Sequence, residues 1–371
     1  MTSDLSLAQL RRLRLRNQSL AEDLRLASVA SLVQRLCALQ SQEWPSAQLA
    51  IAARTPGITH EDLRRAREVD RSFVLTWSLR GTLHLVAAED IGGQLALFGQ
   101  RAISGTNRRY QQLGLSEIIR EKSLDHIAEI LAKDGPLIRA ELAEKLGARR
   151  LPVAGQAIHH LVRYAALRGL ICFGPERAGD LTYTLLAEWL PGYQARDADE
   201  DLLPIFARRY LRAYGPASSA DFARWTGISA KRADAAFGAI AGKCVVCESP
   251  VGTVSLLKGQ IRHLPLSKAE PDLRFLPRYD NYLLVYQSRD FMVDAAYAKR
   301  VHPGGGLIRA CVIIDGEAVA NWKLEQRRKS ARIVVSPFQA LDKSIQPLLE
   351  AEKEKLARFL GREIDLRIED E

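Results

Sequence analysis

One order of secondary-structure elements occurs twice along this chain, and it limits the possible folds more than any other feature. Between residues 123 and 186, the spacing of apolar residues predicts a helix, a short helix, a third helix and a two-stranded hairpin. Residues 202–259 predict the same order, with Ser218 or Ser219 as the N-cap of the short helix. This is the order of a winged helix-turn-helix, so the chain is predicted to contain such units in tandem.

The N-terminal part fits a third unit of the same kind. Its hairpin is expected to turn around Arg80-Gly81. The predicted helices are 7–17, 27–39, 47–54 and 60–69, and the predicted strands are 73–80 and 81–87.

From about Ile261 the pattern changes to short strands, with a hairpin turn at Asp315-Gly316. The predicted strands are 273–277, 281–286, 307–315, 317–325 and 328–338, followed by an amphipathic helix at 345–361. The expected fold is therefore α+β, with three winged-helix units before a β-rich, barrel-like region that has a C-terminal helix. The expected domains are 1–118, 119–198, 199–260 and 261–371.

Composition narrows the class of protein. The 53 Lys and Arg against 44 Asp and Glu give a net charge of +9, which suggests an anionic partner such as a nucleic acid. No apolar run reaches the ~18 residues of a membrane span, so no membrane partner is expected. Five scattered cysteines indicate a reducing cytoplasm, and the isolated Cys244-Val-Val-Cys247 is a poor metal site.

Helix-turn-helix units usually place a helix in a DNA groove, which favours double-stranded DNA as the partner. Winged helices also serve as protein-interaction modules, and that alternative stays open at this point.

Five strings, taken together and in order, resemble a known family. They are ALQSQEWPSAQLAIAAR (38–54), LRGTLHLVAAED (79–90), GPASSADFARWTG (215–227), FLPRYDNYLLVYQSRD (275–290) and GGGLIRACVIIDGEAVANW (304–322). They look like the bacterial winged-helix DNA glycosylases of the AlkZ-like type, which are related to the YcaQ crosslink-repair glycosylases. The resemblance covers nearly the whole chain. It implies a concave DNA-binding surface, excision of N7-alkylated purines and unhooking of interstrand crosslinks.

The family's catalytic signature is Gln-x-Gln, which here reads Gln40-Ser41-Gln42. Ser41 departs from the aliphatic residue that the family has in the middle. Two amide side chains can hold a water molecule, but an amide is not a useful general base. An N7-alkylguanine already carries positive charge and leaves as a neutral base, so oriented water and dipoles are sufficient. Gln42 is expected to place the water and Gln40 to support the water or the sugar. The alternative is that both are ordinary polar residues at a helix end.

Other residues are weaker candidates for DNA binding. Arg80, Thr82 and His84 alternate along one predicted strand, so they are expected to share a face. Asp280-Asn281 lies in a region that the resemblance places near the cleft, although an Asx turn explains it equally. Arg309 follows the glycine-rich turn 302–306, where backbone amides can approach phosphate. The basic runs are Arg11, Arg12, Arg14 and Arg16; Arg108 and Arg109; Arg149 and Arg150; and Arg327, Arg328 and Lys329.

Two functions remain. The first is a monomeric, monofunctional DNA glycosylase without metal or cofactor, acting in DNA repair of alkylated or crosslinked purines. The second is a non-catalytic DNA-binding protein, either a transcription regulator or a factor that sequesters a drug.

Overall fold

The computed structural model describes residues 4–22, 24, 26–197, 201–263, 271–326 and 330–369. The chain forms two compact units. The central unit is Arg65–Leu203, and the discontinuous unit combines Met1–Arg64 with Pro204–Glu371. No helix of the described residues is long and apolar enough to cross a bilayer. The division into four domains stays a prediction.

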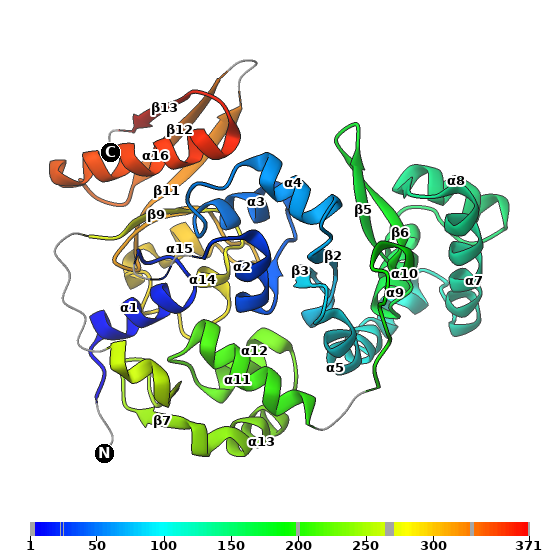
Figure 1. The fold of residues 1–371 in the computed structure, drawn as a ribbon, viewed down its shortest axis with the longest axis horizontal. Coiled ribbons are helices and arrows are strands. Elements are labelled where there is room, and N and C mark those ends of the chain that lie inside the picture. Colours follow the sequence, from blue (N-terminus) through cyan, green and yellow to red (C-terminus); the bar gives the residue numbers. More distant parts are fainter. Residues whose placement is uncertain are drawn as a thin grey trace. The chain divides into compact units, whose positions relative to one another are not determined.

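The elements of the discontinuous unit come from both ends of the chain (Figure 1). Its first part contributes α1 (Leu7–Asn17), α2 (Val29–Leu36), β1 (Leu39–Gln40), α3 (Trp44–Ala52) and most of α4 (His60–Glu68). Its second part contributes α11 (Leu202–Tyr214), α12 (Ser219–Thr226), α13 (Ala230–Ile240), β7 (Cys244–Cys247), β8 (Val254–Leu257), β9 (Leu273–Leu276), α14 (Asn281–Leu284), α15 (Ala298–Val301), β10 (Cys311–Ile314), β11 (Glu317–Gln326), β12 (Ala331–Pro337), α16 (Gln346–Leu360) and β13 (Ile364–Ile368).

The central unit combines a short antiparallel sheet with helices. Its elements are β2 (Phe73–Trp77), β3 (Leu83–Ala87), α5 (Ile91–Ser104), α6 (Asn107–Gln112), α7 (Glu117–Asp134), β4 (Leu137–Ile138), α8 (Arg139–Ala148), α9 (Ala157–Leu167), β5 (Ile171–Arg177), β6 (Asp180–Leu185) and α10 (Leu186–Trp189). These strands lie in the order β3-β2-β5-β6-β4. The predicted hairpin around Arg80-Gly81 is confirmed, because β2 pairs with β3 in antiparallel register from Phe73↔Ala87 to Trp77↔Leu83.

The predicted order of helix, short helix, helix and hairpin is present in both repeats. It consists of α7, α8, α9 and β5–β6 in the first repeat, and of α11, α12, α13 and β7–β8 in the second. In the second repeat Ser218 is the N-cap of α12, and it forms a reciprocal capping box with Asp221. Their assignment as winged-helix units stays a prediction.

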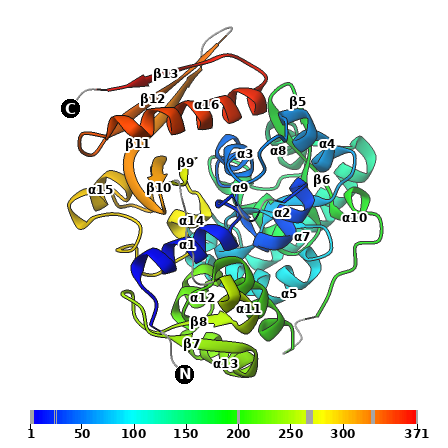
Figure 2. The ribbon, with the colours of Figure 1, turned by 60° about the vertical axis from the view of Figure 1, so that its left-hand side comes forward.

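The β-rich region is not barrel-like, which corrects the sequence prediction. Its strands form an open sheet in the order β13-β12-β11-β10-β9, and α16 lies along this sheet (Figure 2). Leu349 and Leu356 of α16 pack against Trp322, Ile333 and Val335 of the strands. Because one apolar helix face already covers the inner side of the sheet, the strands gain no further burial from closing into a barrel.

Residues 281–286 were predicted as a strand, and this is also wrong. Asp280 instead caps the short helix α14, its side chain accepting a hydrogen bond from the Tyr282 N–H at 2.8 Å. All of Tyr282, Leu283, Val285 and Tyr286 are buried, so a run of apolar residues without alternation could not distinguish a strand from a buried helical turn. The turn at Asp315-Gly316 is as predicted. Both residues have positive φ (48° and 86°), and Ile314 pairs with Glu317.

Candidate active site

The glutamine pair lies on a sharply bent segment between α2 and α3. Helix α2 ends at Cys37, which has a left-handed φ of 61°, and Glu43 is the N-cap of α3. The hydroxyl of Tyr214 donates a hydrogen bond to the carbonyl of Leu36 at 2.7 Å. Burial raises the pKa of Tyr214 well above its ordinary value, so this phenol stays protonated and remains a donor. The end of α2 is thereby fixed from α11.

Asn281 holds the segment from its other side. Its Oδ1 accepts a hydrogen bond from the Gln40 N–H at 2.9 Å, and its Nδ2 donates to the Ala38 carbonyl at 2.9 Å. The same Nδ2 also donates to the Tyr214 hydroxyl at 2.6 Å. Asn281 is 1% exposed, so these bonds form where water does not compete. The amide therefore fixes the backbone on both sides of Leu39.

Asp280, the neighbour of Asn281, belongs to a buried ion pair. Both guanidinium Nη atoms of Arg54 lie 2.7 Å from the two carboxylate oxygens, and both side chains are fully buried. Arg54 also donates to the carbonyls of Gln18 and Ala50, so its guanidinium is well satisfied. Asp280 and Asn281 are thus internal to the fold. Asp280 and Asn281 are each 1% exposed, and their predicted role in DNA binding stays a prediction.

The two glutamines differ in exposure. Gln40 is buried at 9% exposed, whereas Gln42 is exposed. Between them Ser41 is buried, and its hydroxyl donates to the Leu39 carbonyl at 2.9 Å. The serine at the aliphatic position therefore satisfies its polar atom within the segment itself. The segment places Gln42 at the protein surface and Gln40 below it.

An ion pair next to Gln42 was missed from the sequence. Arg278 lies with its Nη1 3.0 Å from Glu43 Oε1, and the second carboxylate oxygen of Glu43 accepts from the Ser46 hydroxyl at 3.1 Å. No motif links residues 43 and 278. Tyr214 and Arg54 were missed for the same reason, since each pairs with a group far away in sequence.

Comparisons with known proteins fit this arrangement. Residues 33–359 match the family described as DNA glycosylase AlkZ-like. The chain belongs to the AlkZ-like DNA glycosylase family. A curated relative, an interstrand DNA cross-link repair glycosylase of Streptomyces sahachiroi, is 27% identical over 345 residues, covering 90% of this chain and 91% of the relative. The solved structure of the DNA glycosylase AlkZ from the same organism matches with a TM-score of 0.84 at 25% identity, over 99% of this chain and 100% of that one. The activity is accordingly that of a DNA glycosylase, a hydrolase of N-glycosyl bonds.

In this AlkZ-like chain, the predicted face of Arg80, Thr82 and His84 is not one exposed strand face. Arg80 sits in the turn with φ 56°, so the strand alternation begins only at Leu83. Arg80 and Thr82 are half-buried, and His84 is 1% exposed. Burial, followed by the charge of Arg80, lowers the pKa of His84 to about 3. His84 is therefore a buried, neutral imidazole, and its predicted role in DNA binding stays a prediction.

Arg309 and the glycine turn are open to solvent in this AlkZ-like chain. Arg309 is exposed, as are Gly304, Gly305 and Gly306, all three of which have positive φ. The position is compatible with the predicted phosphate contact, which nothing in the fold tests.

The basic runs differ in exposure and in their ion pairs. In α1, Arg11 and Arg12 form ion pairs with Glu317 and Asp272, and Arg14 is 1% exposed, so this run holds the fold together. Arg149 pairs with Glu129, Arg108 is exposed, and Arg109 is half-buried. The run Arg327–Lys329 lies outside the described residues. Within the described part of the chain, no group of three or more His, Cys, Asp or Glu could hold a metal ion.

Proposed function

We propose that this AlkZ-like glycosylase hydrolyses the N-glycosidic bond of N7-alkylated purines in double-stranded DNA. Water held by Gln42 adds to the sugar C1′ while the C1′–N9 bond breaks and its electron pair leaves with the base. The water proton passes to solvent, and a free alkylbase and an abasic site result. We infer that purines in interstrand crosslinks are also substrates, and the relative named as an interstrand DNA cross-link repair glycosylase supports this. The enzyme acts as a monofunctional monomer.

The observation that carries the proposal is the attachment of the Gln40–Gln42 segment to Asn281 and Tyr214. An amide on a mobile backbone would hold a water molecule in many orientations and would not favour the reactive one. Here three buried hydrogen bonds, of 2.9, 2.9 and 2.6 Å, involve Asn281. The segment bearing Gln42 is therefore preorganised, which is the condition for catalysis by fixed dipoles.

The charges around the segment also support this chemistry. Glu43, which follows Gln42, is paired with Arg278, and Asp280, the neighbour of Asn281, is paired with Arg54. Neither carboxylate is available as a strong base for an unactivated nucleoside. A substrate that is already cationic does not need one, since its base leaves neutral. The site thus favours N7-alkylated purines over undamaged ones.

The test compares base release from duplex DNA containing N7-methylguanine by the native chain, by Gln42→Ala and by Gln346→Ala. Gln346 is an exposed glutamine at the start of α16 and serves as the matched control. Removing one positioned dipole is expected to slow release about 10²-fold or more, with DNA affinity unchanged. Equal release by the native chain and Gln42→Ala would overturn the role of Gln42.

Absence of release by all three proteins, with tight DNA binding retained, would overturn N7-methylguanine as a substrate. The same assay on a crosslinked duplex then separates a glycosylase of bulkier lesions from the alternative of a non-catalytic DNA-binding protein.

A further inference from the structure

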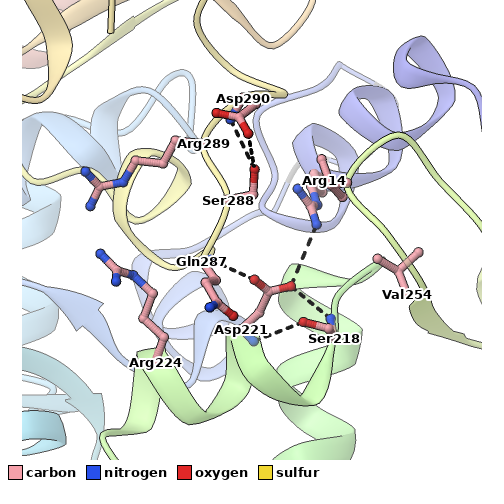
Figure 3. Close-up of a pocket in the computed structure, with 10 residues that line it drawn as sticks. Arg14, Ser218, Asp221, Arg224, Val254, Gln287, Ser288, Arg289 and Asp290 are labelled. Carbon is pink, nitrogen blue, oxygen red and sulfur yellow. Dashed lines mark hydrogen bonds and ion pairs between the residues drawn. The ribbon is translucent and has the colours of Figure 1, made fainter. Parts of the chain in front are cut away.

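A second polar pocket in the discontinuous unit takes no part in the chemistry above. Its volume is about 530 Å³, and three arginines, Arg14, Arg224 and Arg289, line it together with Asp221 and Asp290 (Figure 3). The arginines come from three separate parts of the sequence. A pocket that gathers three guanidinium groups is suited to an anion.

Asp221 builds this pocket. In the capping box of α12 its Oδ2 accepts from the Ser218 N–H at 2.9 Å, and its Oδ1 accepts from the Gln287 N–H at 2.7 Å. One carboxylate therefore ties the start of α12 to the loop that follows α14. As a result Arg224 of α12 and Arg289 of that loop extend in the same direction (Figure 3).

Arg224 and Arg289 have no counter-charge. Among the described residues neither guanidinium forms an ion pair, and the Nε of the half-buried Arg289 has no hydrogen-bond partner. Burial and the like charge of Arg224 lower the pKa of Arg289. Burial, Arg289 and Arg224 also lower the pKa of the nearby His302 to about 4. The fold thus holds two cations together at a cost in free energy that a bound anion would remove.

Arg14 supplies a buried donor at the other end. Its guanidinium lies 3.8 Å from the ring centroid of Tyr286 and 4.2 Å from that of Phe291. Its Nε donates to the Pro216 carbonyl at 2.9 Å, and its Nη2 is 3.9 Å from Asp221. Its Nη1 has no hydrogen-bond partner in the described part of the chain. Arg14 thus places a buried positive charge in the wall of the pocket, next to Asp221.

We propose that this pocket binds a phosphate group, with Arg224 and Arg289 as its principal ligands and Arg14 as a buried donor. Paired guanidinium forks match the oxygens of phosphate. Asp221 forms an ion pair with Arg14 and none with Arg224 or Arg289 in the described part of the chain, so these two guanidinium groups remain for the phosphate. The phosphate belongs either to the DNA backbone, remote from the glutamine pair, or to a free phosphate compound. This inference goes beyond the proposed reaction and does not depend on base release.

The experiment uses the full chain, the double variant Arg224→Ala/Arg289→Ala, and Lys343→Ala/Arg358→Ala as a control that removes the same number of positive charges from exposed positions. One arm measures affinity for an undamaged duplex as a function of salt. A DNA phosphate in the pocket predicts that the slope of log K against log[salt] falls by about 0.9 in the double variant relative to the control.

The other arm measures Tm in inorganic phosphate against chloride of equal ionic strength. A site for free phosphate predicts a rise of about 3 °C for the native chain and the control at ten times Kd, and none for the double variant.

A changed salt slope with no phosphate-specific Tm rise assigns the pocket to DNA, and the opposite result assigns it to a free phosphate compound. An unchanged slope together with no phosphate-specific Tm rise would overturn the proposal. If the double variant does not fold, Arg224→Ala alone, at an exposed position, provides the test. It is expected to show a smaller change in the salt slope or in the phosphate-specific Tm rise.

Discussion

The side chain of Asn281 hydrogen-bonds the main chain of Gln40 across 241 residues of sequence, at 2.9 Å. An asparagine amide presents one acceptor and one donor side by side, as a neighbouring β-strand does. It therefore binds one main-chain N–H and one main-chain carbonyl of the glutamine segment at the same time. Together with Tyr214, Asn281 holds the proposed catalytic segment, which makes it the first target for mutation.

Asn281→Ala is expected to destabilise the protein by about 1–3 kcal/mol, because it removes the buried hydrogen bonds that Asn281 forms with the Gln40 N–H and the Ala38 carbonyl. Urea denaturation measures this loss. Base release is expected to fall further than the folded fraction does, since the segment is no longer held. Full activity of Asn281→Ala at temperatures where it remains folded would show that catalysis does not require the hydrogen bonds from Asn281.

Breaking the pair Asp280–Arg54 is expected to cost about 3–5 kcal/mol, because Asp280→Ala leaves an uncompensated buried guanidinium. The double variant Asp280→Ala/Arg54→Met removes both charges and is expected to recover part of that loss. A double-mutant cycle from denaturation curves gives the coupling. Additive effects of the two single variants would mean that the ion pair contributes nothing beyond packing.

Gln42→Asp compares base release by an amide and by a carboxylate at the same position. An aspartate at the same exposed position can accept a proton from water, so release is expected to persist above pH ~5 and to decline as the carboxylate protonates near pH ~4. The native glutamine does not titrate and is expected to show no such acid limb. Rate profiles of the two proteins between pH 4 and 8 provide the comparison, and identical profiles would remove residue 42 from the chemistry.

His84 is expected to make stability depend on pH. Its folded pKa of about 3 lies below the ordinary 6.5, so the unfolded chain binds more protons between these values. The stabilisation is complete above pH 6.5 and is lost progressively as the pH falls toward 3. In His84→Asn, whose amide can still donate to the Thr82 carbonyl as the ring nitrogen at 3.0 Å does, the free energy of unfolding should vary less steeply across this window. An unchanged slope would mean that His84 is charged in the folded protein.

Local signals in the sequence predicted the elements that depend on local chemistry. The helix predicted at 7–17 has those bounds, with Ser6 and Gln9 forming its capping box, and the hairpin at Asp315-Gly316 needed only its turn residues. The prediction failed at 281–286, where burial removes the alternation that separates strand from helix. It also missed β13, whose parallel pairing with β12 depends on the path of α16 and not on the strand's own residues.

The residues of the proposed site also fall into those found from local sequence and those found only from the fold. Resemblance singled out Gln40 and Gln42, whose motif is contiguous in sequence. The roles of Asn281, Tyr214 and Arg54 arise only from contacts between distant segments. A sequence does not show whether an asparagine is buried and hydrogen-bonds the main chain or is exposed to a ligand. Its exposure is known only from the fold.

The discontinuous unit sets an order of events during synthesis. The glutamine segment leaves the ribosome early, but the groups that secure it, Tyr214 and Asn281, are made only after the whole central unit has been translated. Until then Gln40 and Gln42 lie on a chain end that no side chain constrains. The nascent protein therefore passes through a long interval without a working centre, and no N-terminal fragment that stops before Asn281 can acquire one.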